Sequence, residues 1–210
     1  MRGDSGSRAM AFTYFFRDMS ALQAIKGHVI PRLRSYRYIW VWDAGCAMGP
    51  EPYSLAIIFR EALGYYGFKR VKIFATDLDE ENRRFGQIIA KAIYPEQSVK
   101  RIPRELLNKY FINEGPGLYR ISDELKRCIV FQRHDLRSLE PVRTNFGLIV
   151  CKNVLLHFKE RERIDIIKMF HQCLIPGGFF VTEQTQQLPM ELSNLFMRVL
   201  PNVQLFQKLQ

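Results

Sequence analysis

Apolar positions along the chain alternate between two spacings, which predicts alternating strands and helices. Short runs rich in β-branched and aromatic residues predict strands at 38–42, 70–75, 129–133, 146–151 and 179–182. Apolar residues at helical spacing predict helices at 20–33, 80–91 and 159–174. Two further apolar runs, 195–200 and 203–209, flank Pro201 and Asn202 and predict a terminal antiparallel hairpin. Strands spaced by helices and followed by a hairpin predict an α/β fold with a seven-stranded mixed sheet.

The segment 38–56 is expected to form the strand, loop and helix around which the rest of the chain is organised. An aromatic strand is followed by a loop that carries Gly45 and Gly49, where a missing Cβ permits positive φ or close approach of a ligand. A helix follows, with Pro50 and Pro52 in its first turn, where proline is well tolerated. We expect its buried stripe to consist of Leu55, Ile58, Phe59, Ala62, Leu63 and Tyr66. This strand, loop and helix are typical of the opening unit of a nucleotide-type α/β fold.

Two parts of the chain depart from regular alternation. Residues 1–11 are polar and contain Gly and Ser, so we expect a disordered lead followed by a single domain at 12–210. Between about 94 and 127 the pattern loosens: a helix at 104–110 follows Pro103, and a Gly-Pro-Gly turn at 115–117 precedes a short strand at 118–121. This stretch predicts a small inserted subdomain.

Composition is that of an ordinary soluble globular chain, with 47% hydrophobic and 25% charged residues. No apolar run approaches the ~20 residues of a membrane span, so no membrane insertion is expected. The four cysteines are scattered without a C-x-x-C pair, and the four histidines show no ligand spacing, so neither a metal site nor a disulfide framework is expected. Free cysteines fit a reducing cytoplasm.

The net charge of +10 points to an acidic partner rather than to nucleic acid. The basic residues are dispersed, and no helix carries the basic stripe with interleaved aromatics that nucleic-acid binding favours. Most of these charges belong to a solvated surface. An acidic protein partner is therefore expected, bound by a monomer.

Acidic residues lie where a phosphate-binding loop would have none. Glu51 is in the first turn of the helix and Asp43 closes the preceding strand, and two carboxylates there would repel a pyrophosphate. They suit a cofactor with a cationic end, such as S-adenosylmethionine, which has an ammonium and a sulfonium. In the alternative, Glu51 only complements the helix dipole, which is worth ~0.3–1 kcal/mol.

Asp77 follows the second predicted strand, at the edge where open α/β sheets bind ligands. A carboxylate at that position can accept hydrogen bonds from both hydroxyls of a ribose. In the alternative, Asp77 or Asp79 caps the helix that follows. Both roles can hold at once, with Asp79 capping and Asp77 binding.

Five motifs in the expected order resemble the CheR family, the chemotaxis-receptor glutamate methyltransferases. The T-x-F-F-R signature of that family is matched at 13–17, and its A-G-C-S-T-G-E-E-P-Y-S-[IL]-A loop at 44–56. Its A-T-D-[IL]-D motif is matched at 75–79, its C-R-N-V-[LM]-I-Y-F motif at 151–158, and its Pro-Gly-Gly turn at 176–178. The resemblance covers residue 13 to the C-terminus and implies a Rossmann-like class I S-adenosylmethionine methyltransferase fold.

The resemblance implies a cofactor site for S-adenosylmethionine and its product S-adenosylhomocysteine. It implies that Glu51 binds the methionine ammonium, Asp77 holds the ribose, and Asp135 and Leu136 flank the adenine. The full set of implied cofactor-binding residues is Thr13, Arg17, Ala44, Gly45, Glu51, Asp77, Leu78, Asp135, Leu136 and Asn153. The implied partner is an acidic protein, the cytoplasmic helix of a chemoreceptor.

Arg17, Lys152 and His157 are the implied catalytic residues. A glutamate is already ionised at neutral pH, so its methylation needs alignment more than a general base, and Arg17 can hold the carboxylate bidentately. The usual C-R-N-V arginine is Lys152, and the usual tyrosine of the same motif is His157. Imidazole can accept a proton near neutral pH, so His157 leaves open a hydroxyl, amine or thiol substrate, or it only fills the tyrosine's space.

The cofactor loop departs from the family pattern as well. Ala47, Met48 and Pro50 replace a serine, a threonine and a glutamate, which removes polar groups near the cofactor. A second alternative is therefore a cofactor-binding regulatory module without catalytic activity.

Overall fold

The computed structural model describes residues 13–79 and 84–209, so the disordered lead predicted at residues 1–11 lies outside the described part of the chain. Its main element is a seven-stranded sheet in the order β6-β2-β1-β7-β8-β10-β9. The strands are β1 (Ile39–Ala44), β2 (Val71–Asp77), β6 (Ile129–Arg133), β7 (Phe146–Cys151), β8 (Leu174–Thr182), β9 (Phe196–Arg198) and β10 (Leu205–Lys208). The first five are parallel, and β10 and β9 are antiparallel, so the predicted mixed sheet and terminal hairpin are confirmed.

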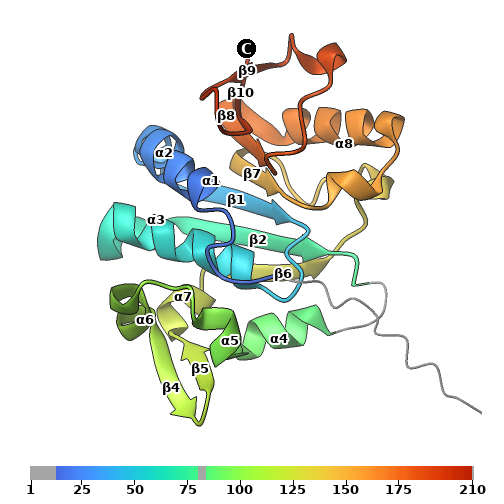
Figure 1. Ribbon diagram of the computed structural model, residues 1–210. Helices are drawn as coiled ribbons and strands as arrows, with labels where there is room; N and C mark the ends of the chain where they lie inside the picture. The colour runs from blue at the N-terminus through green and yellow to red at the C-terminus, as the bar shows by residue number, and fades with distance from the viewer. Residues whose placement is uncertain (1–12, 80–83, 210) are drawn as a thin grey trace, which may run out of the picture.

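Helices cover both faces of this sheet (Figure 1). One face packs against α3 (Pro50–Phe68) and against the continuous helical segment of α1 (Met19–Ala24), a π-helical turn at Ile25–Val29 and α2 (Ile30–Leu33). The other face packs against α8 (Glu160–Cys173), whose buried residues include Ile164, Ile167 and Phe170. Because β1 pairs with β2 on one side and β7 on the other, strand order reverses there, and the carboxyl ends of these strands form the crevice where α/β folds bind ligands.

The predicted stripe of α3 is correct only in its first half. Leu55, Ile58 and Phe59 are buried, but Ala62 is exposed and Tyr66 is 81% exposed. Gly64, with φ 68° and ψ 179°, breaks the helix before Tyr66 and moves that side chain out of the predicted stripe, although Phe68 at the end of α3 is buried again.

A second sheet of three strands lies beside the first, in the order β3 (Ile93–Pro95), β5 (Leu118–Ile121) and β4 (Phe111–Gly115). With it are α4 (Phe85–Lys91), α5 (Glu96–Val99), α6 (Arg104–Tyr110) and α7 (Asp123–Lys126). Its buried residues belong to the same core as α3, so the two sheets share one hydrophobic interior. The boundaries of an inserted subdomain remain a prediction.

Two predicted elements differ in detail from the structure. The strand expected at 179–182 is longer, because β8 already begins at Leu174 and includes the Pro-Gly-Gly turn at 176–178, with a register shift against β7. The described part of the helix expected at 80–91 is α4, and the Asp79 carboxylate accepts a hydrogen bond from its first amide, Phe85 N, at 3.3 Å. None of the helices in the described ranges has the length and hydrophobicity that a membrane crossing requires.

Candidate functional site

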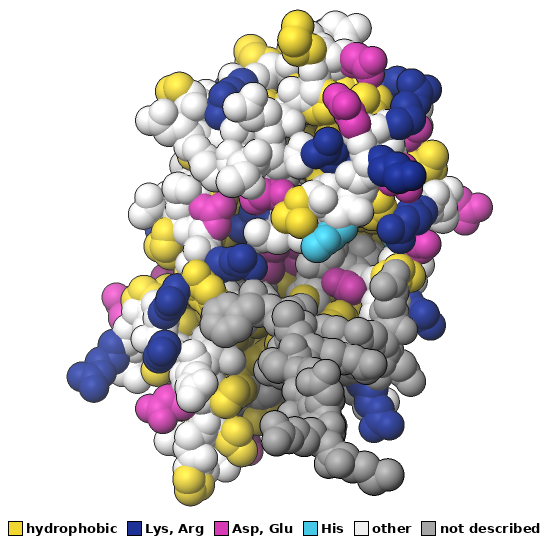
Figure 2. Space-filling model, turned by 45° about the vertical axis from the view of Figure 1, so that its right-hand side comes forward, with side chains coloured by type: hydrophobic (Ala, Val, Ile, Leu, Met, Phe, Trp, Pro, Cys, Tyr) yellow, Lys and Arg dark blue, Asp and Glu magenta, His cyan; other side chains and the backbone are white. Residues whose placement is uncertain are grey.

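A cleft of about 810 Å³ opens along the carboxyl ends of β1, β2, β6 and β7. Acidic, basic and histidine side chains gather near the middle of this face of the molecule (Figure 2). The lining comes from the ends of these strands and the segments that follow them, from the chain before α1, from α1 itself and from the starts of α3 and α4: Thr13, Tyr14, Arg17, Asp18, Leu22, Gly45, Cys46, Ala47, Glu51, Ser54, Thr76, Asp77, Leu78, Asp79, Phe85, His134, Asp135, Leu136, Arg137, Lys152, Asn153, Val154, His157 and Phe158. Its volume is in the range of small-molecule and cofactor sites.

The loop after β1 is fixed by the neighbouring strand. Gly45 has φ 104°, and its amide donates a hydrogen bond to Thr76 O at 2.7 Å. The amide of Ala47 donates to Asp77 Oδ2 at 2.9 Å, and Asp77 Oδ1 accepts from the amide of Asp79 at 3.1 Å. Asp77 therefore orders the loop and the start of its own turn, and each carboxylate oxygen keeps a lone pair for a ligand hydroxyl.

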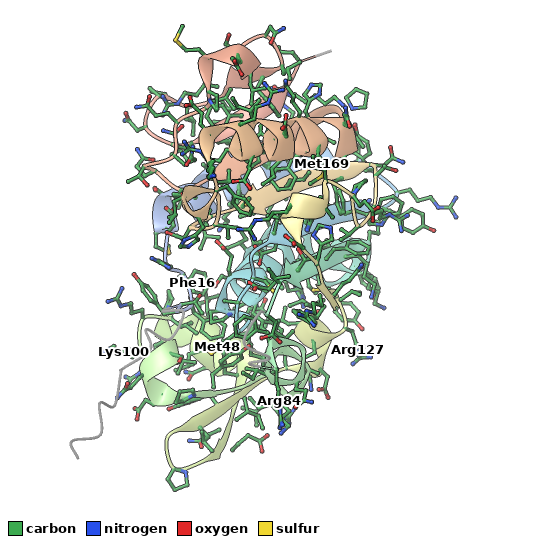
Figure 3. The ribbon with its side chains drawn as sticks, turned by 90° about the vertical axis from the view of Figure 1, so that its right-hand side faces the viewer. Phe16, Met48, Arg84, Lys100, Arg127 and Met169 are labelled. Carbon is green, nitrogen blue, oxygen red and sulfur yellow. The ribbon has the colours of Figure 1, made fainter. Side chains whose placement is uncertain are left out.

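A glycine is required at position 49 because side chains of α4 and β3 approach it closely. It has φ 102°, and a Cβ on it would lie 2.6 Å from the Tyr94 hydroxyl and 2.7 Å from Ile89 Cγ1. The same hydroxyl donates to Met48 O at 2.8 Å. Met48, labelled in Figure 3, is thus bound through its backbone, so the loss of a polar side chain at this position leaves the loop anchored.

Glu51 already holds an ammonium group, that of Lys152. The Lys152 Nζ lies 2.6 Å from Glu51 Oε1 and 3.8 Å from Asp18 Oδ2, and the Lys152 side chain is 5% exposed. Burial acts to lower the pKa of Lys152, but the charge and hydrogen bond of Glu51, aided by Asp18 and Asp43, outweigh it and raise that pKa above its usual value. Since a carboxylate has about four acceptor positions, Glu51 can accept from a second ammonium on its cleft side.

Asp43 lies beneath this pair at the end of β1. It is fully buried, and neither carboxylate oxygen has a hydrogen-bond partner among the described residues. Burial is the main cause that raises the pKa of Asp43 well above its usual value, and the negative charges of Glu51 and Asp77 add to it while Lys152 opposes it. Around the Lys152 ammonium, Glu51 and Asp18 supply two carboxylates, so this part of the cleft favours a cationic ligand.

Thr13, Arg17 and Asp18 reach the cleft because a tight turn separates them from two buried phenylalanines. Phe15 is fully buried, with ring centroids 5.0 Å from Tyr94 and 5.3 Å from Phe111. Phe16, labelled in Figure 3, has φ 56°, and its amide donates to Ser54 Oγ at 3.0 Å. The turn directs Phe15 into the second sheet and Arg17 towards the cleft.

Apolar and capped segments line the other end of the cleft. Leu136 is buried, and the Asp135 carboxylate accepts from Arg137 N at 2.9 Å, which caps the 3-10 turn Leu136–Ser138. Phe158 lies under the Arg137 guanidinium, 5.0 Å from ring centroid to Cζ. Leu78 follows Asp77 on the same side. This end offers apolar surface and an aromatic ring to a flat heterocycle.

Of the residues predicted for the site, all but one line this cleft. The exception is Ala44, whose side chain is buried in the core beside Trp42, because its direction alternates away from the cleft at the end of β1. Asn153 has φ 57°, and its amide donates to Glu183 Oε2 at 2.9 Å. His157 ends the 3-10 turn Leu155–His157 and is exposed at the rim.

Sequence reasoning missed two acidic residues that organise the site. Asp18 caps α1 through Ala21 N at 3.0 Å and lies 3.8 Å from the Lys152 ammonium. Glu183, at the end of β8, accepts hydrogen bonds from Asn153 N and, at 2.8 Å, from Thr182 Oγ1. The signal for Asp18 was its position before an apolar helix, which is typical of an N-cap; Glu183 had the same signal as Asp77, a carboxylate that follows a predicted strand.

The side chains that line the cleft fit S-adenosylmethionine better than a nucleotide phosphate. Glu51 and Asp18 present carboxylates where a phosphate site would present amides and cations. Asp77 offers acceptors for hydroxyl groups, and Leu136 and Phe158 offer apolar surface in the same cleft. A ligand with a cationic end, a sugar and a flat base matches this set of groups.

Comparison with known proteins gives one family match. Residues 11–201 match the family described as "CheR methyltransferase, SAM binding domain". The chain is 29% identical over 189 residues to "Chemotaxis protein methyltransferase 2" of Vibrio cholerae serotype O1, a match that covers 88% of this chain and 64% of that protein. It is 34% identical over 173 residues to "Chemotaxis protein methyltransferase" of Salmonella typhimurium, covering 79% of this chain and 57% of that protein. The chain thus spans about six-tenths of the length of these relatives.

A solved structure supports the fold. The "rRNA methyltransferase aviRa" of Streptomyces viridochromogenes superposes with a TM-score of 0.57 over 96% of this chain and 87% of that one, at 10% identity. At this identity the similarity concerns the architecture of the sheet and helices alone.

Proposed function

Because the chain belongs to the CheR methyltransferase family, we propose that it transfers a methyl group from S-adenosylmethionine to glutamate side chains of a chemoreceptor-type protein. The observation that carries the proposal is the cleft at the strand switch point, whose lining includes the carboxylates of Asp18, Glu51 and Asp77. A carboxylate-rich floor suits a sulfonium cofactor and would repel a phosphate-bearing one. We further propose that the protein acts as a monomer in the cytoplasm on an acidic partner, which its net charge of +10 favours.

Each end of the cleft has a role in this proposal. Glu51, beside Lys152, accepts the cofactor's α-ammonium, and Asp77 accepts the ribose hydroxyls. Leu78, Asp135 and Leu136 enclose the adenine. Thr13, Gly45 and Asn153 line the space between these ends, where small or backbone groups permit close approach. The bound cofactor supplies an electrophilic methyl group on a positively charged sulfur.

The residues of this chain position the nucleophile. The acceptor glutamate is ionised at neutral pH, so its oxygen can form the new O–C bond as the S–C bond breaks, with no proton to remove. Arg17, at the cleft and exposed, is placed to hold that carboxylate through two parallel hydrogen bonds. Alignment of the two reactants is then the main source of rate enhancement, worth up to ~7–11 kcal/mol.

The direct test is transfer of a labelled methyl group from S-adenosylmethionine to a purified chemoreceptor cytoplasmic fragment. The proposal predicts labelled fragment whose label is released by mild base, since a carboxylic ester is base-labile. Replacement of the acceptor glutamates by glutamine should abolish the labelling. Cofactor binding without any labelling would instead favour a regulatory module without catalytic activity.

A second substrate class is favoured by the exposure of His157 at the rim of the cleft. As a general base it would allow methylation of a hydroxyl, amine or thiol in a small molecule or another protein. The variants His157→Tyr and His157→Phe separate the two proposals. If His157 is a general base, both variants should lose turnover while cofactor affinity is retained. If the reaction is glutamate methylation, His157→Tyr should keep its turnover.

A further inference from the structure

Arg101 lies outside the cleft, next to one of its walls. Its guanidinium carbon is 4.1 Å from the centroid of the Tyr14 ring, a cation–π stack. Tyr14 lines the cleft, and the guanidinium carbon of Arg17 is 6.0 Å from the same ring centroid. Two guanidinium groups thus lie near one aromatic ring, one at the cleft and one beyond it.

The backbone holds Arg101 in this place. Val99 and Ile102, on either side of it in the chain, are 1% and 6% exposed and belong to the shared core. The amide of Ile102 donates to Val99 O at 2.9 Å and closes a turn. Arg101 is exposed between these two buried anchors. Lys100, which precedes it, lies on the same side of the molecule as Phe16 in Figure 3.

This geometry prepares the guanidinium for an anion. A stacked guanidinium uses its face for the ring and leaves the N–H groups along its edge available for a planar carboxylate. Within residues 13–79 and 84–209, no ion pair joins Arg101 to an acidic side chain. Stacking also restricts the side chain in advance, so less conformational entropy is lost when a carboxylate binds.

We propose that Arg101 is a substrate-specificity residue: its guanidinium, stacked on Tyr14 at the mouth of the cleft, binds an acidic side chain that flanks the methylated glutamate of the protein substrate. The inference rests on the proposed function, since it places the acceptor glutamate at Arg17. The guanidinium carbons of Arg17 and Arg101 lie 6.0 Å and 4.1 Å from the centroid of the Tyr14 ring, so the distance between the two carbons cannot exceed the sum of these values. The flanking acid is therefore within a few residues of the acceptor in sequence or on one helix face.

The test compares Arg101→Ala with Lys100→Ala, the neighbouring exposed cation, on a purified chemoreceptor cytoplasmic fragment. Arg101→Ala should raise KM for the fragment roughly fivefold and leave kcat unchanged, since an exposed ion pair contributes up to ~1 kcal/mol. Lys100→Ala should leave KM within about twofold. A fragment in which the acids flanking the acceptor are changed to glutamine should show equal KM with Arg101→Ala and with the unsubstituted enzyme.

Binding of the same fragment to enzyme saturated with S-adenosylhomocysteine provides a reading that needs no turnover. Loss of affinity in Arg101→Ala, with cofactor affinity unchanged, supports the inference even where no methyl transfer is detected and the proposed function fails. Equal KM and equal affinity for Arg101→Ala and Lys100→Ala would overturn it. Failure of the unsubstituted enzyme to bind the fragment would also overturn it.

Discussion

Lys152 sets the charge balance of the cleft. It stands where the family pattern has an arginine, so a compact point charge replaces a planar, five-donor fork. The structure gives that point charge two carboxylate neighbours, Glu51 at 2.6 Å and Asp18 at 3.8 Å, in an almost fully buried position. A compact ammonium suits this place, since it can serve two acids from different elements at once.

Removal of this lysine should destabilise the fold. Lys152→Met leaves Glu51 and Asp18, whose side chains are 18% and 26% exposed, without this counter-ion. Breaking a fully buried pair costs about 3–5 kcal/mol of unfolding free energy, and the partial exposure of the two acids to the cleft makes the expected loss smaller than that. Adding Glu51→Gln should recover part of that loss, because the uncompensated charge is removed. Urea unfolding of both variants measures this, with Lys168→Met, an exposed lysine of α8, as the matched control. A loss in Lys152→Met no greater than in Lys168→Met would contradict the ion-pair account.

Asp43 should make stability depend on pH. A carboxyl group whose pKa is raised in the folded state binds its proton more tightly there than in the unfolded chain. The protein therefore loses stability as the pH rises from the usual aspartate range through the raised pKa. Asp43→Asn lacks this loss, so its Tm relative to the unsubstituted protein should increase between about pH 4 and pH 7.

Thermal unfolding across this pH range provides the measurement. Asp165→Asn, which removes a half-exposed carboxylate from α8, is the matched control. If the Tm difference between Asp43→Asn and the unsubstituted protein stays constant with pH, the pKa of Asp43 is not raised, and its carboxyl group is either exposed or has a partner.

At the scale of elements, the sequence predicted the strands and the loop after β1 well. Runs rich in β-branched and aromatic residues predicted the five parallel strands, and the central strands β1 and β7 are almost completely buried. The glycines at 45 and 49 were singled out correctly, and both have positive φ. Ala47 also has positive φ, at 46°, and nothing in an alanine indicates this in advance. Its conformation follows from the hydrogen bond to Asp77, a contact between elements.

The end of α3 shows where periodicity fails. A helical stripe that continues to Tyr66 assumes unbroken helix, but Gly64 departs from helical geometry at φ 68°. A Cβ at Gly64 would meet nothing within 4 Å, so only the backbone resists substitution there.

Gly64→Ala should therefore destabilise the protein by about 1–3 kcal/mol, the cost of holding an L-residue in a backbone region that is essentially restricted to glycine. Gly27 is the matched control, since it is also in open space but lies in the π-helical turn of the first helical segment without positive φ. Gly27→Ala should stabilise by up to about 1 kcal/mol. Urea unfolding distinguishes the two signs, and stabilisation by both variants would mean that α3 is continuous.

For the whole molecule, the sequence predicted which residues meet but not how they pair. Parallel strands bring their carboxyl ends to one edge, so Gly45, Asp77, Asp135 and Lys152 had to lie along a common crevice. That Glu51 would bind Lys152, and that Asp18 would join them, depends on the relative placement of α1, α3 and β7. No local pattern encodes that placement. The same holds for the stack of Arg101 on Tyr14, which joins the second sheet to the chain before α1.

Titration calorimetry of S-adenosylmethionine tests the central claim most directly, because every proposed role depends on this cleft as the cofactor site. The account predicts one site per chain, with binding weakened at least about tenfold in Glu51→Gln and in Asp77→Asn, each of which removes a charge-assisted hydrogen bond worth ~1.5–3 kcal/mol. Thermal unfolding should show that both variants remain folded. Unchanged affinity in the two folded variants, or no binding by the unsubstituted protein, would contradict the account.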